Sequence, residues 1–301
     1  MSTSRISIVG ATGAGKTKLS LELARHEARI ALFSCDSMAV YRQMDIGTAK
    51  PSSAELGGLT YRLIDLVDPS EEFSIAAFQA HAKAAEDELR DGEVALYVGG
   101  SGLYHSAIFN SLVIPPSDPA VRATLEADLE RVGFEVMYQR LKEIDPAGAA
   151  KIEINNSRRL IRALEVCEIT ASPYSGFGPG ISAYEPSDAV ILGLRSEIGV
   201  LDGAIANRVL EQFEAGWIQE CEKLAAMGEL SRSASFAIGY REIFAYLRGE
   251  ITRERAIEAT IARTRRFARR QRSWFGRDPR IRWYDSPAEL SDALLGSLEG
   301  P

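Results

Sequence analysis

The chain has 301 residues, of which 46% are hydrophobic and 26% charged, a composition that buries a core and excludes wholesale disorder. Its net charge of −7, taken alone, argues against a nucleic-acid partner. No apolar run approaches the roughly 20 residues that span a bilayer, and no signal peptide is recognisable. The three cysteines are far apart without CxxC spacing, so we expect free thiols in a reducing, cytoplasmic compartment.

The first hundred residues alternate short β-like runs with helical patterns. The expected strands lie at 6–9, 30–33, 62–65 and 94–98, and the expected helices at about 16–28 and 75–90. This alternation is typical of βαβ units. It predicts an α/β fold with a parallel sheet as its core, which is P-loop NTPase-like in view of the segment GATGAGKT at 10–17.

The pattern changes after the Pro115-Pro116 turn. Beyond it the apolar spacing is helical as far as a loop rich in Gly, Pro and Ser, and a β-like run then resumes at 189–194. We therefore predict an all-helical domain at 117–187, inserted into a core made of 1–116 and 188–301. The rest of the C-terminal part is expected to be helical.

The segment Gly10-Ala11-Thr12-Gly13-Ala14-Gly15-Lys16-Thr17 matches GxxxxGK[ST] in full, between the first strand and the first helix. The glycines let successive N–H groups point at one anion, Lys16 adds a full positive charge, and Thr17 offers a hydroxyl to Mg²⁺. The motif indicates a di- or triphosphate, ATP included, without saying which. The Asn-Lys-x-Asp motif of GTPases is absent, and the strand at 94–98 ends without the acidic pair of a motor ATPase.

Asp36 directly follows the second strand, and ligands of parallel sheets gather beyond the carboxyl ends of strands. Two interpretations stay open: Asp36 caps a turn, or it is a general base beside a phosphate-bearing substrate. The polar segment 44–51 has the character of a recognition loop.

Residues 253–282 carry eleven arginines against three acidic residues, a local charge of +8 that leaves −15 for the rest. On a helical wheel the arginines between 263 and 272 share one arc, opposite an apolar arc of Ile257, Ile261, Phe267, Ala268, Trp274 and Phe275. We interpret the segment as an amphipathic helix whose cationic face binds a phosphate backbone. A second group of arginines lies in the helical insertion.

Seven segments resemble the tRNA dimethylallyltransferase (tRNA isopentenyltransferase) family, in order and over essentially the whole chain. They are GATGAGKT, CDSMAVYRQMDIGTAKP, YRLIDLVDP, VGGSGLY, SRRLIRALEV, FAIGYRE and RTRRFARRQRSWF. The resemblance implies transfer of a dimethylallyl group from dimethylallyl diphosphate to N6 of the adenosine 3′ to the anticodon. It also implies Mg²⁺ as cofactor and the tRNA anticodon stem-loop as partner, with the helical domain at 117–187 as a tRNA-binding domain.

The same resemblance implies a set of site residues. Asp36 would be the general base, and Ser101 would be a second catalytic residue where the family usually has Thr. Arg208 and residues 10–17 would hold the diphosphate, with Thr17 on the metal. The residues expected to contact tRNA are Asp36, Ser37, Met38, Ala39, Ser101, Arg122, Arg158, Arg159, Arg162, Arg266 and Arg270.

Two positions depart from the family pattern. Ala204 stands where a second arginine is common, which puts a two-arginine clamp in doubt. Met38-Ala39 replaces Arg-Gln, which leaves the backbone of 37–39 to line the channel.

Three other functions fit parts of the sequence. A small-molecule P-loop kinase would use 253–282 as its lid, and a non-catalytic RNA-binding ATPase would use the same segment to hold RNA. A prenyltransferase acting on free AMP would need only the P-loop and Asp36, but a single nucleotide does not need so wide a cationic face. We expect a monomer without a membrane partner.

Overall fold

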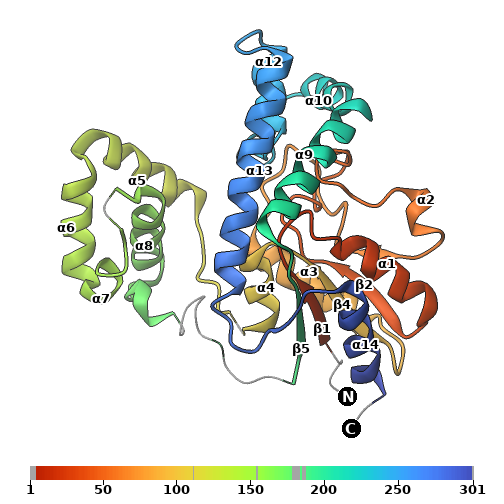
Figure 1. Ribbon diagram of the computed structural model, residues 1–301. Coiled ribbons are helices and arrows are strands. Elements are labelled where there is room, and N and C mark those ends of the chain that lie inside the picture. Colours follow the sequence, from red (N-terminus) through yellow and green to blue (C-terminus); the bar gives the residue numbers. More distant parts are fainter. Residues whose placement is uncertain (1–4, 111, 154, 178–183, 185–187, 300–301) are drawn as a thin grey trace. The chain divides into compact units, whose positions relative to one another are not determined.

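The computed structural model describes residues 5–110, 112–153, 155–177, 184 and 188–299. Six parallel strands form one sheet in the order β3-β2-β4-β1-β5-β6. The strands are β1 (Arg5–Val9), β2 (Ile30–Ser34), β3 (Tyr61–Arg62), β4 (Val94–Gly99), β5 (Val190–Leu194) and β6 (Arg282–Tyr284). The predicted α/β fold with a parallel sheet is confirmed (Figure 1).

The sheet is covered by helices on both faces. One face packs through Ile8, Leu32 and Leu96 on α1 (Lys16–His26) and α14 (Pro287–Leu298). The other face packs through Phe33 and Tyr97 on a second layer of helices. Successive strand residues thus belong to different clusters, and burial on both faces explains the continuous apolar runs that identified the strands.

The helices of the second layer and the remaining C-terminal helices follow in chain order. They are α2 (Ser53–Leu56), α3 (Ile75–Asp87), α4 (Gly102–Phe109), α9 (Ile198–Glu214), α10 (Trp217–Ala226), α11 (Arg232–Ser235), α12 (Tyr240–Leu247) and α13 (Arg253–Phe275). None of the helices within the described ranges has the length and apolar character needed to cross a membrane.

The sheet order places β4 between β1 and β2, and this sets the position of the candidate site. In the register Val9 lies beside Gly99, and Ser34 lies beside Val98. The three strands therefore end together, and the loops that follow them start from one edge of the sheet.

Two strands differ from the prediction. β3 is only two residues long, because Leu63 and Asp65 adopt positive φ values of 64° and 55° that no strand accommodates. β6 lies in a part predicted to be helical. Its three residues pair with β5 but are too few to show the alternation that signals a strand.

Contacts divide the chain into two compact units, 1–110 with 184–301 and 111–183. The second unit holds α5 (Pro119–Val132), α6 (Phe134–Ile144), α7 (Pro146–Ala149), α8 (Ser157–Thr170) and a 3₁₀ turn, Tyr174–Gly176. It has a core of its own around Leu125, Leu141 and Leu164.

Candidate active site

The loop after β1 has the backbone geometry of an anion cradle. Gly13 and Gly15 have φ values of 86° and 87°, a region that favours glycine, and α1 begins directly after Gly15. The N–H groups of Gly13, Gly15, Lys16 and Thr17 donate to no acceptor within the described part of the chain. A helix N-terminus with free N–H groups attracts an anion.

Lys16 and Arg208 place two positive charges beside this loop. Lys16 is 9% exposed, and its Nζ donates to the Ala11 carbonyl at 2.8 Å. Burial and, to a smaller extent, Arg208 lower the pKa of Lys16 to about 8, while Asp36 opposes the shift. Burial likewise lowers the pKa of Arg208, again against the effect of Asp36. Two cations thus share one nearby carboxylate, and a bound anion would relieve their repulsion.

Asp36 combines the two interpretations that the sequence leaves open. Its Oδ1 accepts the backbone N–H groups of Met38 at 2.8 Å and Ala39 at 3.4 Å, so it does cap a turn. Its Oδ2 accepts no hydrogen bond from any described residue, and the side chain is half-buried. One carboxylate oxygen therefore fixes the orientation, and the other is available to take a proton.

The predicted nucleotide-side residues bond to one another. Ser101 is buried, and its Oγ accepts the N–H of Ser37 at 3.0 Å and lies 3.3 Å from the Ser37 hydroxyl. With the Met38 and Ala39 N–H groups also engaged by Asp36, the N–H groups of 37–39 shape the turn and are not free for RNA. A contact between tRNA and Ser37, Met38, Ala39 or Ser101 stays a prediction.

Charged side chains, both within the polar segment 44–51 and outside it, hold that segment in its conformation. Lys50 is nearly buried and donates to the Tyr41 carbonyl, to Asp45 at 2.7 Å and to Asp65 at 2.5 Å. Glu220 accepts the N–H of Ile46 at 2.7 Å. These contacts hold the loop, and its part in recognition is untested by them.

α13 packs against the core through small residues as well as Phe275. Its buried positions are Ala256, Thr260, Thr264, Ala268, Gln271 and Phe275. Two members of the predicted apolar arc, Ala268 and Phe275, belong to this buried stripe, and the others, Ile257, Ile261, Phe267 and Trp274, are half-buried. Each buried threonine bonds to the carbonyl four residues back at 2.8 Å, so its hydroxyl is satisfied inside the core.

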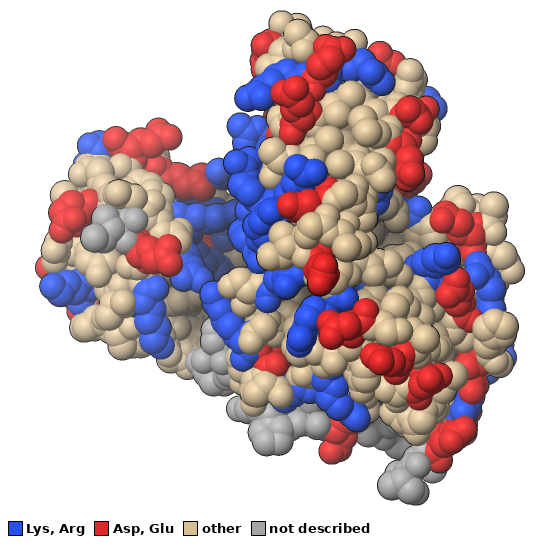
Figure 2. Space-filling model, in the orientation of Figure 1, with Lys and Arg blue, Asp and Glu red and all other residues tan. Residues whose placement is uncertain are grey.

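Lys and Arg side chains gather along α13 (Figure 2). Five of its arginines are engaged: Arg255 with Glu258, Arg263 with Glu242, Arg265 and Arg269 with Asp202, and Arg272 with the Ser196 carbonyl. Arg266 and Arg270 are exposed, and neither pairs with an acid in the described ranges. Arg270 lies over the Phe267 ring at 5.7 Å. These two arginines, both predicted to contact tRNA, are free to bind phosphate.

The arginines of the helical unit fall into two groups. Arg122 and Arg162 each reach Glu165 at 2.7 Å, and Glu165 is fully buried. Burial raises the pKa of Glu165, but the hydrogen bonds from both arginines outweigh it, and the pKa is lowered. Arg158 and Arg159 are exposed, without an acidic partner among the described residues. The first pair is part of the unit's own structure, so Arg158 and Arg159 are the freer candidates for RNA.

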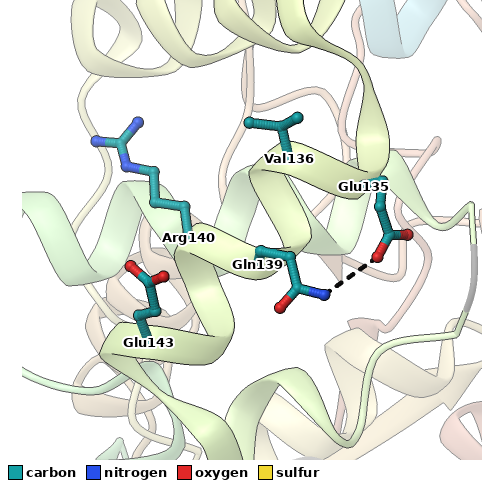
Figure 3. Close-up of a pocket in the computed structure, with 5 residues that line it drawn as sticks. All are labelled: Glu135, Val136, Gln139, Arg140 and Glu143. Carbon is teal, nitrogen blue, oxygen red and sulfur yellow. Dashed lines mark hydrogen bonds between the residues drawn. The ribbon is translucent and has the colours of Figure 1, made fainter.

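The hollow drawn in Figure 3 belongs to the same unit. It has a volume of about 380 Å³ and is lined by Glu135, Val136, Gln139, Arg140 and Glu143. All five lie on α6, and none is a predicted site residue. The hollow has no part in the candidate site.

One residue at the site has no counterpart in the sequence prediction. Gln271 lies inside the arginine run, and its side chain hydrogen-bonds to the backbone of both Thr12 and Gly100. The signal that could have found it is its place four residues before Phe275 and three after Ala268. A polar side chain on the buried face of a helix needs partners there.

Comparisons with known proteins point to one family. The family model described as IPP transferase matches residues 39–278. A tRNA dimethylallyltransferase of a Nocardioides species is 42% identical over 96% of this chain and 94% of its own, and one from Salinispora arenicola is 44% identical over 96% and 85%. The crystal structure of tRNA isopentenylpyrophosphate transferase from Bacillus halodurans is 38% identical, with a TM-score of 0.71 over 99% of this chain and 97% of that one.

A structure of eukaryotic dimethylallyltransferase acting on tRNA is 26% identical, with a TM-score of 0.78 over 94% of this chain and 74% of that one. The resemblance predicted from the seven sequence segments is thereby confirmed. The chain belongs to the IPP transferase family, and it is similar to curated tRNA dimethylallyltransferases along nearly their whole length.

Proposed function

We propose that this chain transfers a dimethylallyl group from dimethylallyl diphosphate to N6 of the adenosine 3′ to the anticodon in tRNA, and releases diphosphate. The observation that carries the proposal is the electrostatic coupling of Lys16, Arg208 and Asp36 at the ends of β1 and β2. An excess of positive charge beside free N–H groups suits a diphosphate. A carboxylate with one free oxygen suits the removal of a proton.

The residues divide the reaction between them. The N6 lone pair forms the new bond to C1 of the allyl group, while the C1–O bond breaks and its electron pair leaves on the diphosphate. Asp36 Oδ2 takes the proton that N6 loses, a contribution of about 10²–10⁴-fold. Lys16, Arg208 and the free N–H groups of Gly13, Gly15, Lys16 and Thr17 bind the diphosphate and offset the charge that develops on it.

Thr17 is the residue that fits a metal ion carried by the diphosphate. Other helical threonines, such as Thr124 and Thr260, bond to the carbonyl four residues back. The Thr17 hydroxyl makes no hydrogen bond within the described residues and is free to ligate. Mg²⁺ often takes one or two protein oxygens and completes its shell with phosphate and water, which agrees with the lack of an acidic cluster in the described ranges. When bound, Mg²⁺ would neutralise charge on the leaving diphosphate.

The tRNA would lie on the exposed arginines of α13, Arg266 and Arg270, with Arg158 and Arg159 as a second contact. Such contacts position RNA by its phosphates and do not read its sequence. The target base must leave the anticodon stack, at a cost of a few kcal/mol, to reach Asp36. A cytoplasmic location and a monomeric state stay predictions.

The experiment is a single incubation of the protein with Mg²⁺, dimethylallyl diphosphate and unmodified tRNA, followed by digestion to nucleosides. N6-dimethylallyl adenosine at the position 3′ to the anticodon is the expected product. Binding of tRNA without a modified base would instead favour an RNA-binding module. Consumption of ATP with no use of the prenyl donor would favour a kinase, and prenylation of AMP in preference to tRNA would favour a free-nucleotide acceptor.

A further inference from the structure

Gln271 connects the loops that follow β1 and β4. It extends from α13, is 4% exposed, and uses both ends of its amide. Oε1 accepts the N–H of Thr12 at 2.8 Å, and Nε2 donates to the carbonyl of Gly100 at 2.9 Å. Thr12 belongs to the anion cradle, and Gly100 directly precedes Ser101. One side chain thus bridges the diphosphate side and the nucleotide side of the proposed site.

The amide packs closely against its neighbours. A Cβ at Gly100 would lie 2.1 Å from Gln271 Nε2, so the amide can keep its present position only beside a residue without a side chain. A Cβ at Gly102 would lie 2.3 Å from Trp274 Nε1, one turn further along α13. The helix and the loop after β4 are therefore in direct contact, which fixes the depth at which the amide enters.

The bond to Thr12 decides which N–H groups remain for an anion. Since the Thr12 N–H points to Gln271, the cradle is left with those of Gly13, Gly15, Lys16 and Thr17. On its other side the loop rests on α9, where a Cβ at Gly13 would meet Ile205 at 3.2 Å and Leu201 at 3.3 Å. The cradle is held between α9 and Gln271.

The bond to Gly100 extends the same support to Asp36. The Ser101 hydroxyl accepts the N–H of Ser37, and Asp36 closes the turn that starts there. A shift of the loop after β4 would thus move Ser101 and the turn together. Gln271 fixes the separation between this turn and the cradle.

We propose that Gln271 is a positioning residue for the transfer reaction, one that holds the diphosphate cradle and the Ser101–Asp36 turn at the separation the reaction needs. The inference rests on the proposed function, and Gln271 itself touches no reacting atom. Removal of the amide leaves a buried N–H and a buried carbonyl without partners, and the two loops then relax apart. A displacement of about 1 Å between reacting groups can lower a rate by about 100-fold.

Two variants and one control test the proposal. Gln271→Met keeps the length and volume of the side chain and removes both hydrogen bonds. Gln271→Glu keeps an acceptor for Thr12 but, when ionised, sets an oxygen against the Gly100 carbonyl. The control is Gln212→Met, because Gln212 is also buried, at 8% exposure, and its Nε2 also donates to a backbone carbonyl, that of Ile46 at 2.5 Å.

Gln271→Met should lower kcat by about 10–100-fold and raise the KM for dimethylallyl diphosphate, with the Kd for tRNA unchanged. Gln271→Glu should recover activity as the pH falls, relative to the wild type, because a protonated carboxyl donates to Gly100. Gln212→Met should lower the Tm by a similar amount and, at saturating tRNA, leave kcat and the KM for dimethylallyl diphosphate unchanged, because the partner of Gln212 lies in the 44–51 segment and not in the cradle or the Ser101–Asp36 turn. Wild-type kinetics in Gln271→Met, or losses no larger than those of the control, would overturn the proposal.

A titration of Mg²⁺ and inorganic diphosphate, followed by calorimetry without tRNA, separates this inference from the proposed function. An inactive wild type would refute the transfer reaction alone. Weaker diphosphate binding by Gln271→Met than by Gln212→Met would still support the positioning of the cradle. Equal binding by the two variants would refute it, whatever the activity.

Discussion

Replacing Asp36 with asparagine separates its two roles, because asparagine keeps the turn and loses the base. The Oδ1 of asparagine can accept the same N–H groups of Met38 and Ala39 that Asp36 accepts at 2.8 and 3.4 Å. Asparagine and aspartate serve almost equally in such turns, so the unfolding free energy should change by less than about 1 kcal/mol. The amide, however, cannot take the proton of N6.

The expected result is a fall in kcat of about 10²–10⁴-fold, or about 3–5 kcal/mol in the barrier, with an unchanged Kd for tRNA. Asp36 also supports the protonation of Lys16, so the pKa of Lys16 should drop below its present value of about 8. Single-turnover transfer to an anticodon stem-loop measures the chemical step. Filter binding measures the RNA affinity, and thermal unfolding measures the stability.

Asp118→Asn is the matched control. Asp118 Oδ1 accepts the N–H groups of Ala120 at 2.8 Å and Val121 at 3.3 Å, almost the same geometry as at Asp36. This variant should leave kcat unchanged. Wild-type turnover in Asp36→Asn would refute the general base, and a joint loss of turnover, RNA affinity and Tm would show that the aspartate is structural.

Three further outcomes are expected. The affinity for dimethylallyl diphosphate should fall as the pH rises above about 8, by at most about tenfold per pH unit. The reason is that Lys16 loses its proton in the free site but keeps it when the diphosphate is bound. Calorimetry at several pH values measures this affinity, and a flat pH profile would contradict the prediction. Arg266→Ala and Arg270→Ala should each reduce the salt dependence of tRNA binding by about one phosphate contact. Arg255→Ala is the control and should not, because Arg255 pairs with Glu258. Equal slopes of log Kd against log salt concentration for all three variants would show that α13 does not bind the RNA. Glu165→Gln should destabilise the helical unit by about 2–3 kcal/mol in denaturant unfolding at neutral pH. Because the pKa of Glu165 is lowered in the folded state, this difference in stability should vanish as the pH falls through that pKa. An unchanged unfolding midpoint at neutral pH would show that the ion pairs contribute nothing to stability.

The sheet was predictable wherever buried apolar runs were long enough to show. β1, β2, β4 and β5 each lie within one residue of the prediction, because burial on both faces leaves an unbroken apolar run between turns. β3 was placed too far along the chain, since positive φ values at Leu63 and Asp65 leave no trace in apolar patterning. β6 was missed because three residues carry no period.

The residues of the candidate site could be predicted where a motif of fixed spacing indicates a chemical function. The P-loop and Asp36 follow strands that end at one edge of the sheet, and strand order alone brings them together. Which arginines of α13 are free was not predictable, because their partners Glu242 and Asp202 lie on other helices. Gln271 was not predicted for the same reason, because its hydrogen-bond partners lie in two loops more than 170 residues away.

The position of β4 between β1 and β2 fixes the distance between these two strands. Adjacent strands in a sheet are about 4.8 Å apart, so the loop proposed to bind the leaving diphosphate and the turn that holds Asp36, the proposed base, start two spacings, about 10 Å, from one another. That width is set by backbone hydrogen bonds in the interior, which no surface substitution alters. A relative with a bulkier prenyl donor would have to make room through its loops and side chains, while the span between the first and second strands stayed the same.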